Sequence, residues 1–397
     1  MKCSTLEVAI AGAGIGGLAL SILLAKENAK VVVYDQMTAP KPVGSGFVLQ
    51  PTGLAVLAAM GLKKHIQERG ARITNMYGRL SKSKRTVLSI SYDKGRHGLA
   101  VQRAALFNLL FSEAVRCGVQ FETSSRITAI EPQTKPRLLS AAGVALPPAD
   151  LVIDAMGASS TVGASGRTEL NYGALWATVA WPEGGPFHPE HLEQRYQRAS
   201  RMAGVLPVGT VADGAPPKAT FFWSLRNRDF QRWCADGRTR WIEEVSEIWP
   251  EAAQFAESAE PVHAHYRHHT RSATLGQHAI KIGDAWHATS PQLGQGANMA
   301  LLDAMSLILA LKREASIADA LAAHLAQRRP HITLYQMLSL LLTPFYQSDS
   351  RLLPFMRDIA IGPVTALPGV RQLVSHLVTG ELLDPLRRIG LTDTHQN

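Results

Sequence analysis

A glycine motif near the N-terminus places the strongest constraint on the fold of this chain. Gly12, Gly14 and Gly17 form a GxGxxG pattern directly after Glu7–Ala11, a run typical of a short buried strand. The first glycine allows a tight turn, the second lets a pyrophosphate approach the backbone, and the third lets the next helix pack against the strand. The pattern therefore predicts a βαβ unit that binds a dinucleotide.

The residues that follow agree with this prediction. Leu18–Lys26 is predicted to be a helix, and the β-branched run Lys30–Tyr34 a second strand, which Asp35 ends. Asp35 follows Gly14 by 21 residues, a separation at which a carboxylate can accept hydrogen bonds from ribose hydroxyls. The N–H groups and the dipole at the helix start favour the phosphate charge. By itself this motif does not distinguish FAD from NAD.

A second motif, far along the chain, makes that distinction. Asp284 lies 270 residues after Gly14 and follows a predicted strand, Ala279–Ile282, where a carboxylate can accept hydrogen bonds from a polyol. The Gly-Gln-Gly turn at 294–296 precedes the predicted helix Asn298–Leu311 and presents bare N–H groups to an anion. Together they suit the ribityl chain and the pyrimidine end of a flavin, which gathers negative charge when reduced.

On these motifs the sequence resembles the group A flavoprotein monooxygenases, the family of p-hydroxybenzoate hydroxylase. The markers are the first glycine motif, Arg103 in VQRAALFNLL, and the Gly-Asp segment through Asp303; the resemblance runs from Val8 to about Ala310. It implies an FAD cofactor, with Asp284 on the ribityl chain and Arg103 on the phosphate and ribityl region. The implied cofactor-binding residues are Gly12, Gly14, Gly17, Asp35, Arg103, Asp284, Pro291, Gly294, Gln295, Gly296, Ala297 and Asn298.

The resemblance also implies the reaction. NAD(P)H would reduce the flavin, O2 would add to it, and a flavin hydroperoxide would deliver one oxygen atom to a small aromatic or polyketide-like substrate. No catalytic acid or base is assigned, and His287 is interpreted as a packing or hydrogen-bonding residue. The histidine-rich segment at 263–269 has no carboxylate or cysteine at ligand spacing, so no metal site is predicted.

One motif departs from the family. After a strand of the Asp150–Asp154 type, the family carries an Asp-Gly pair followed by Ala-Arg-Ser; here Met156 replaces the aspartate and Ser159 the arginine. That motif is associated with FAD and NAD(P)H binding. The alternative function is therefore an FAD-dependent oxidase or dehydrogenase, or an oxygenase that a partner reductase supplies. Asp154, two residues before Met156 and so on the same strand face, is a candidate replacement for the missing aspartate.

The sequence predicts an α/β fold with three regions. A Rossmann-type FAD-binding domain is expected over 1–72, 98–164 and 272–310. An inserted antiparallel β-sheet substrate domain is expected over 73–97 and 165–271, where tryptophans and turn signals are frequent. A helical C-terminal region, 311–397, is predicted to contain the helix Ile317–Arg328, with later prolines such as Pro344 as breaks.

The substrate pocket is predicted to lie between the flavin and the middle sheet. Strand alternation places Tyr172, Trp176 and Thr178 on one face, and Phe222 and Trp223 are further candidates. The alternative interpretation is that these aromatic residues are simply sheet core.

The composition limits the classes of molecule that this protein is expected to bind. The net charge is +9, but no run of five like charges and no recognition motif accompanies it, so nucleic acid is not expected. Three distant cysteines indicate no disulfide framework and a reducing compartment. No stretch is apolar enough to span a bilayer, so a cytoplasmic enzyme is expected. Its predicted partners are a small-molecule substrate and O2. Whether two copies of the chain form a homodimer is left open by the sequence.

Overall fold

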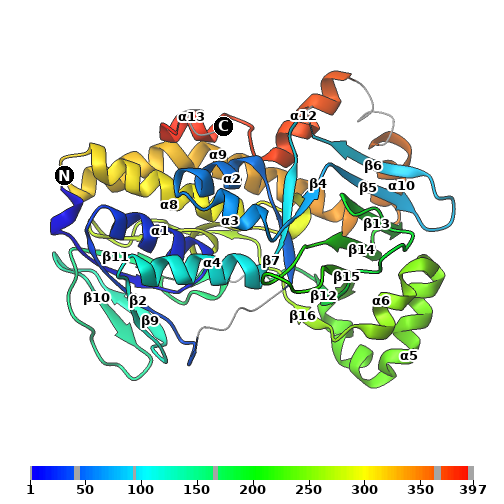
Figure 1. Ribbon diagram of the computed structural model, residues 1–397, viewed down its shortest axis with the longest axis horizontal. Helices are drawn as coiled ribbons and strands as arrows, with labels where there is room; N and C mark the ends of the chain where they lie inside the picture. Colours follow the sequence, from blue (N-terminus) through cyan, green and yellow to red (C-terminus); the bar gives the residue numbers. More distant parts are fainter. Residues whose placement is uncertain (1, 40–44, 93–94, 164–168, 362–367, 392–397) are drawn as a thin grey trace.

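The computed structural model describes residues 2–39, 45–92, 95–163, 169–361 and 368–391. The molecule is elongated, with a parallel sheet at one end and a larger, mostly antiparallel sheet at the other (Figure 1). No helix in these ranges is both long enough and apolar enough to cross a membrane. The predicted α/β architecture, with a helical C-terminal region, is confirmed.

The parallel sheet brings distant segments to one edge. Its strand order is β18-β11-β1-β2-β8. The strands are β1 (Glu7–Ala11), β2 (Lys30–Tyr34), β8 (Gln120–Glu122), β11 (Leu151–Asp154) and β18 (Ala279–Lys281). The register pairs Ala11 with both Tyr34 and Asp154, and Asp154 with Lys281. Four strands therefore end side by side, and the segments that follow them meet at the carboxyl edge, where α/β sheets bind ligands.

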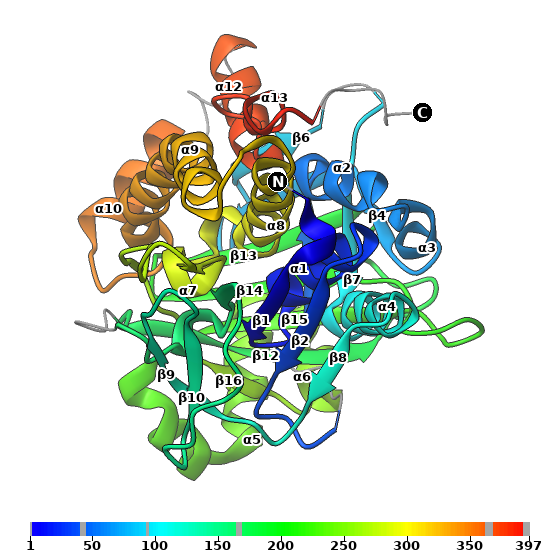
Figure 2. The same ribbon diagram turned by 90° about the vertical axis from the view of Figure 1, so that its left-hand side faces the viewer.

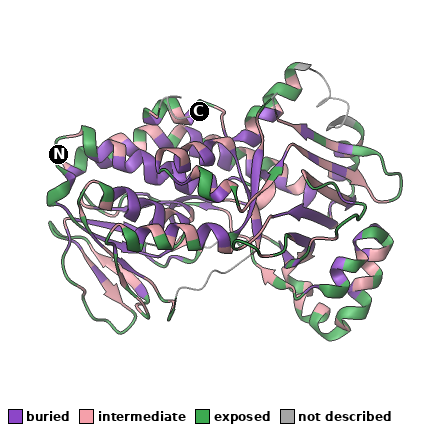
Figure 3. Cartoon of the chain, in the orientation of Figure 1, coloured by how far each residue is buried: buried purple, intermediate pink, exposed green. Residues whose placement is uncertain are grey.

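Helices α1 (Ile15–Lys26) and α8 (Gly296–Arg313) pack closely over this sheet (Figure 2). At Gly16 an added Cβ would lie 3.4 Å from the Cβ of Ala300, so a small residue is needed for this approach. Helix α1 is apolar around most of its circumference because it lies between the sheet and α8. Figure 3 shows the burial that results in this part of the molecule.

Several smaller elements lie beside these sheets and helices. Helix α4 (Arg103–Arg116) also packs against α1, and α2 (Pro51–Ala59) packs against α8. A three-stranded sheet has the order β3-β7-β4, and β9 and β10 form a hairpin. Their bounds, with that of α3, are β3 (Gly46–Leu49), β4 (Ala71–Ile73), β7 (Gly98–Gln102), β9 (Ile127–Glu131), β10 (Arg137–Ser140) and α3 (Lys63–Gln67).

The larger sheet has the order β16-β12-β15-β14-β13-β5-β6. All of its strands come from 73–97 and 165–271: β5 (Asn75–Leu80), β6 (Thr86–Ser91), β12 (Tyr172–Ala180), β13 (His191–Gln197), β14 (Arg201–Pro207), β15 (Lys218–Arg226) and β16 (Val262–Ala264). Neighbouring strands are antiparallel except β13 and β5, which are parallel. Helices α5 (Phe230–Ile248) and α6 (Ala253–Ser258) cover one face of this sheet.

The C-terminal region corrects one prediction. The helix expected to end at Arg328 continues as α9 (Ile317–Tyr346), and both Pro330 and Pro344 lie inside it. An interior proline costs about 3 kcal/mol. The helix persists because side chains such as Ile332 are buried in the same apolar core as α1 and α8. The remaining elements are α10 (Leu352–Met356), a π-helical turn (Arg357–Ile361), α12 (Pro368–Thr379) and α13 (Pro385–Ile389).

Candidate functional site

The turn between β1 and α1 leaves an open space at the carboxyl edge. Gly12 has a φ of +105°, and an added Cβ would lie 2.5 Å from the carbonyl oxygen of Ala155. At Gly17 an added Cβ would lie 2.1 Å from the carbonyl oxygen of Gly12. At Gly14, by contrast, the nearest atom would be 3.9 Å away. Gly14 is also the N-cap of α1, where no side chain caps the helix, so backbone N–H groups are open to an anion.

Asp35 is held against this turn. Its carboxylate accepts hydrogen bonds from the backbone N–H of Ala13 at 2.6 Å and of Met37 at 2.9 Å. A small cavity of about 120 Å³ adjoins Asp35 and Gly12 and is also lined by Arg126. Asp35 therefore lies beside the glycine turn, and its binding to ribose hydroxyls stays a prediction.

Asp284 and Arg103 form an oppositely charged pair beyond β18. Asp284 begins α7 (Asp284–His287), and Arg103 begins α4, with its guanidinium 5.4 Å from the ring centroid of Phe47. Burial raises the pKa of Asp284, and the charges of His287 and Arg103 oppose that rise. Burial lowers the pKa of Arg103, and Asp284 opposes that fall. Asp284 is half-buried and the Arg103 side chain is exposed, and each charge helps to keep the other ionised.

The loop before α8 also lies at the carboxyl edge of the parallel sheet. It contains a single 3-10 turn, Pro291–Leu293, followed by Gly294 with a φ of +61°. No side chain caps the N-terminus of α8, and an added Cβ at Gly296 would lie 3.7 Å from Oδ1 of Asp284. The first turn of α8, which includes Ala297, therefore opens beside Asp284.

Two predicted side chains in this loop make contacts within the protein. Nε2 of Gln295 donates to the carbonyl oxygen of Val378 at 2.6 Å, at the end of α12. Oδ1 of Asn298 accepts a hydrogen bond from the backbone N–H of Gln50 at 2.9 Å. These hydrogen bonds fix the loop to α12 and to the start of α2.

The hypothesis that Asp154 replaces the missing aspartate is wrong. Asp154 is fully buried and accepts hydrogen bonds from Oγ of Ser160 at 2.6 Å and from the N–H of Met156 at 3.1 Å. Strand β11 ends at Asp154, so the alternation that would align Asp154 with Met156 does not continue. Both oxygens of the Asp154 carboxylate therefore accept hydrogen bonds from within the same loop.

An arginine that sequence reasoning missed contacts the altered motif. Nη1 of Arg267 donates to Oγ of Ser159 at 2.6 Å and to the carbonyl oxygen of Ala158 at 3.3 Å. Arg271 donates to the carbonyl oxygen of Ser160 at 2.8 Å. A guanidinium thus lies beside Ser159, the position where the family motif carries arginine. No local pattern could reveal it, because Arg267 is 108 residues from Ser159.

The substrate candidates divide between the two faces of the larger sheet. The rings of Trp176 and Phe222 lie on one face, with centroids 4.8 Å apart. Thr220 shares the Phe222 face by alternation, and its Oγ1 accepts a hydrogen bond from the N–H of Gly46 in β3. Trp223 is the exception among the candidates: it packs in the core under α5 with Trp241. Trp223 points away from the face that carries Phe222, because neighbouring residues of a strand point to opposite faces.

The other two candidates lie towards opposite ends of β12. The hydroxyl of Tyr172 donates to Oδ1 of Asp349 at 2.5 Å and accepts from Nε of Arg226 at 3.0 Å. Burial raises the pKa of Tyr172 to about 12. Thr178 is exposed. Of the predicted set, Trp176 and Phe222 are the pair that the structure brings together.

Gln50 and Tyr92 are further residues that the sequence did not single out. The hydroxyl of Tyr92 donates to Oε1 of Gln50 at 2.7 Å, and Gln50 is only 1% exposed. Burial raises the pKa of Tyr92, which therefore stays protonated. Because Gln50 also contacts Asn298, this chain of hydrogen bonds links β6 and α2 to the start of α8. Only Pro51, a helix-start signal, marked this place in the sequence.

A buried ionic cluster supports the Gly-Asp turn from behind. The carboxylate of Asp303 accepts from the N–H of Gly283 at 2.9 Å, from Nε2 of His287 at 2.7 Å and from Nε of Arg328 at 2.7 Å. Burial alone would raise the pKa of Asp303, but His287 and Arg328 hold it well below its usual range. His287 makes a hydrogen bond here, as predicted. The cluster joins the β18–α7 turn to α8 and α9.

Comparisons with known proteins agree with this geometry. The family model described as "FAD binding domain" matches residues 5–333. The FAD-dependent urate hydroxylase of Mycolicibacterium vanbaalenii is 25% identical over 348 residues, with 81% of this chain and 84% of that protein covered. The kynurenine 3-monooxygenase of Salinispora arenicola is 25% identical over 370 residues, with 82% and 76% covered. The crystal structure of Klebsiella pneumoniae HpxO, complexed with FAD and uric acid, has the same fold, with a TM-score of 0.78 at 20% identity and coverage of 94% and 97%.

Proposed function

The chain belongs to the FAD binding domain family, within the group A flavoprotein monooxygenases, and from that premise we propose that it inserts one oxygen atom from O2 into a small aromatic substrate, with NAD(P)H as reductant. One observation carries the proposal. The glycine turn, Asp35, Asp284 and the uncapped start of α8 meet at the carboxyl edge of a single parallel sheet.

The described residues fit FAD in an extended pose along this edge. The open space at Gly14 and the N-terminus of α1 suit the pyrophosphate, and Asp35 suits the adenosine ribose. The Arg103–Asp284 pair suits the phosphate and the ribityl hydroxyls. When bound, FAD supplies the redox and oxygen chemistry. The N-terminus of α8 favours negative charge at the pyrimidine end of the ring system.

For the substrate we propose a planar ring compound on the Trp176–Phe222 face. The two named relatives act on urate and kynurenine, both of which contain rings. Aromatic side chains favour a flat ring through stacked or edge-on packing. Thr220 and Gly46 join this face to the β3 segment next to Gln50, which keeps the substrate close to the start of α8. The protein would orient the ring and exclude water from it.

We also propose the predicted division into an FAD-binding part and a substrate part. The seven-stranded sheet with α5 and α6 would form the substrate part. Helix α9 would belong with the FAD-binding part, because its buried side chains share one core with α1 and α8. A homodimer stays a prediction.

The choice of reductant depends on the altered central motif. Met156 and Ser159 favour the second candidate, in which a partner reductase or the substrate itself reduces the flavin. We propose instead that Arg267 supplies the positive charge that the motif lacks, because its guanidinium hydrogen-bonds to Ser159 and Ala158. The enzyme would then accept electrons from NAD(P)H directly.

Anaerobic stopped-flow absorbance tests the proposed function. The purified protein with oxidised flavin is mixed with NADH or NADPH, with and without a panel of phenolic and heteroaromatic compounds. We expect the flavin absorbance to bleach, and one compound of the panel to accelerate bleaching. If neither nucleotide bleaches a flavin that dithionite still reduces, the proposed reductant is wrong and the second candidate function is favoured.

Replacing Arg267 by glutamine should weaken the nicotinamide interaction selectively. Loss of hydrogen bonds to a charged group costs about 1.5–3 kcal/mol, so the NAD(P)H concentration that half-saturates flavin reduction should rise about tenfold to a hundredfold. FAD affinity should stay unchanged. The double variant Arg267→Gln with Ser159→Arg, which restores the arginine of the family motif, should recover most of the loss.

The matched control for this prediction is Arg228→Gln, at an arginine whose side chain is 70% exposed and pairs with Asp349. It should leave reduction by NAD(P)H unchanged. Equal half-saturation in the wild type and in Arg267→Gln would show that Arg267 has no part in nicotinamide binding.

A further inference from the structure

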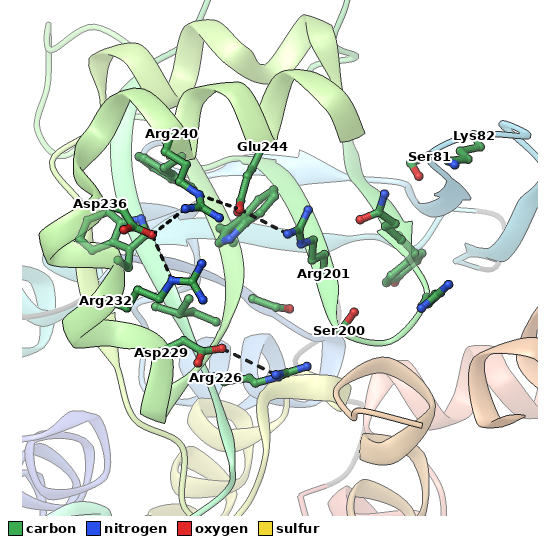
Figure 4. A pocket seen from close by; sticks show the side chains of 18 of the residues that line it. Ser81, Lys82, Ser200, Arg201, Arg226, Asp229, Arg232, Asp236, Arg240 and Glu244 are labelled. Carbon is green, nitrogen blue, oxygen red and sulfur yellow. Dashed lines mark hydrogen bonds and ion pairs between the residues drawn. The ribbon is translucent and has the colours of Figure 1, made fainter. Parts of the chain in front are cut away.

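A large cavity lies on the α5 side of the seven-stranded sheet (Figure 4). Its volume is about 860 Å³, and it opens between α5, the ends of β14 and β15, and the turn after β5. None of the residues that line it belongs to β1, β2, β11, β18 or α8. The cavity is therefore separate from the carboxyl edge proposed for FAD.

The wall of the cavity is rich in guanidinium groups. Arg232, Asp236, Arg240 and Glu244 lie on both sides of a kink in α5 at Gly237, and ion pairs join each of them to the next. Arg240 lies 3.2 Å from Asp236, and Glu244 lies 3.3 Å from Arg201 of β14 (Figure 4). These ion pairs hold the guanidinium groups in place around the opening.

Positive charge exceeds negative charge in this wall by two. Six basic residues line the cavity: Lys82, Arg198, Arg201, Arg226, Arg232 and Arg240. Four acidic residues line it: Asp229, Asp236, Glu244 and Asp358. Such an excess in a recess attracts an anion more strongly than the same charges on an open surface would.

Two indole groups supply an independent sign of a ligand. Trp233 and Trp241 line the cavity, with ring centroids 5.8 Å apart in an edge-on arrangement. The Nε1–H group of each is enclosed and has no acceptor among the described residues. Trp241 is only 1% exposed. A buried donor without a partner costs about 1–3 kcal/mol, so an acceptor that reached either group through a side-chain rearrangement would recover this energy.

We propose that this cavity is a second small-molecule site, which binds an aromatic compound that carries an oxyanion. The carboxylate or phosphate of the ligand accepts hydrogen bonds from Arg201 and Arg240, which match either group in geometry. The indole N–H group of Trp233 donates to the same ligand, and its half-buried ring packs against the flat apolar part of the ligand. The site is independent of the flavin reaction and has a different set of residues.

Calorimetric titration of the FAD-loaded enzyme tests the proposal. The probes are salicylate, phenyl phosphate and inorganic phosphate, each titrated into the wild type and into Arg240→Gln, Arg201→Gln and Trp233→Phe. We expect saturable binding of salicylate or phenyl phosphate that weakens about tenfold to a hundredfold in the arginine variants. Trp233→Phe keeps the ring and removes the donor, so it should weaken binding by a smaller factor.

The control variant is Arg228→Gln, which should bind the probes as the wild type does. Flavin absorbance, recorded in parallel, reports binding at the flavin and should respond equally in all variants. No saturable binding of either aromatic probe, or binding that the three variants leave unchanged, would overturn the proposal. Inorganic phosphate that binds as tightly as phenyl phosphate would overturn the aromatic part of it. A comparison of the affinities for salicylate and phenyl phosphate shows whether the site prefers a carboxylate or a phosphate.

Discussion

Replacing Gly14 by alanine is expected to give a folded protein that no longer retains FAD. Gly14 has a φ of −73°, which any residue adopts, and an added Cβ would meet no atom closer than 3.9 Å. As an N-cap change from glycine to alanine, the substitution should cost about 1 kcal/mol of stability at most. The new methyl group would, however, occupy the space through which a pyrophosphate approaches the start of α1.

The expected loss of FAD affinity is about a hundredfold or more. This loss corresponds to two charge-assisted hydrogen bonds between the pyrophosphate and backbone N–H groups of α1. Each is worth about 1.5–3 kcal/mol. Titration of the apoprotein with FAD, followed by flavin fluorescence, measures it. Thermal unfolding of the apoprotein reports stability separately.

Two other glycines serve as controls for this prediction. Gly369→Ala places a methyl group in α12, where no atom lies within 4 Å, and should leave FAD affinity unchanged. Gly12→Ala combines a φ of +105° with a 2.5 Å approach to a backbone oxygen, so it should also destabilise the apoprotein. Wild-type FAD affinity in Gly14→Ala would contradict the proposed position of the pyrophosphate.

Replacing Arg328 by methionine should destabilise the whole protein. Arg328 and Asp303 are both fully buried, with Nε and Oδ1 2.7 Å apart. Removal of the Arg328 guanidinium leaves the buried charge of Asp303 with too few partners. Such a loss lowers the free energy of unfolding by about 3–5 kcal/mol. The loss should appear as a lower midpoint of urea unfolding, and the turn that carries Asp284 should loosen because Asp303 also accepts from the N–H of Gly283.

An ion pair of the same length with an exposed arginine is the matched control. Nε of Arg116 lies 2.7 Å from Oε2 of Glu113, but the Arg116 side chain is 69% exposed. Arg116→Met should cost no more than about 1 kcal/mol, because solvent screens that pair. The double variant Asp303→Asn with Arg328→Met removes both buried charges and should recover part of the lost stability. Equal midpoint shifts for Arg116→Met and Arg328→Met would contradict the prediction.

Features of this protein that depend on local geometry could be predicted from its amino-acid sequence. The GxGxxG turn, Asp35 and the Gly-Asp segment each predict a strand end followed by a turn or helix, and each is found there. The parallel pairing then follows from the βαβ pattern, because crossovers of this kind bring carboxyl ends to one edge. Buried runs such as KVVVY marked the strands of that sheet.

The tertiary structure decided whatever depends on contacts between distant segments. Helix α9 continues through two prolines because its side chains are buried against α1 and α8, and propensity alone could not predict that. Trp223 and Phe222 are neighbours in sequence, yet only the packing of α5 determines which face is covered. Arg267 reaches Ser159, and Arg201 reaches Glu244 of α5, because folding joins segments that no sequence spacing relates. Local patterns specify backbone turns, whereas side-chain partners are chosen by the packing of whole elements.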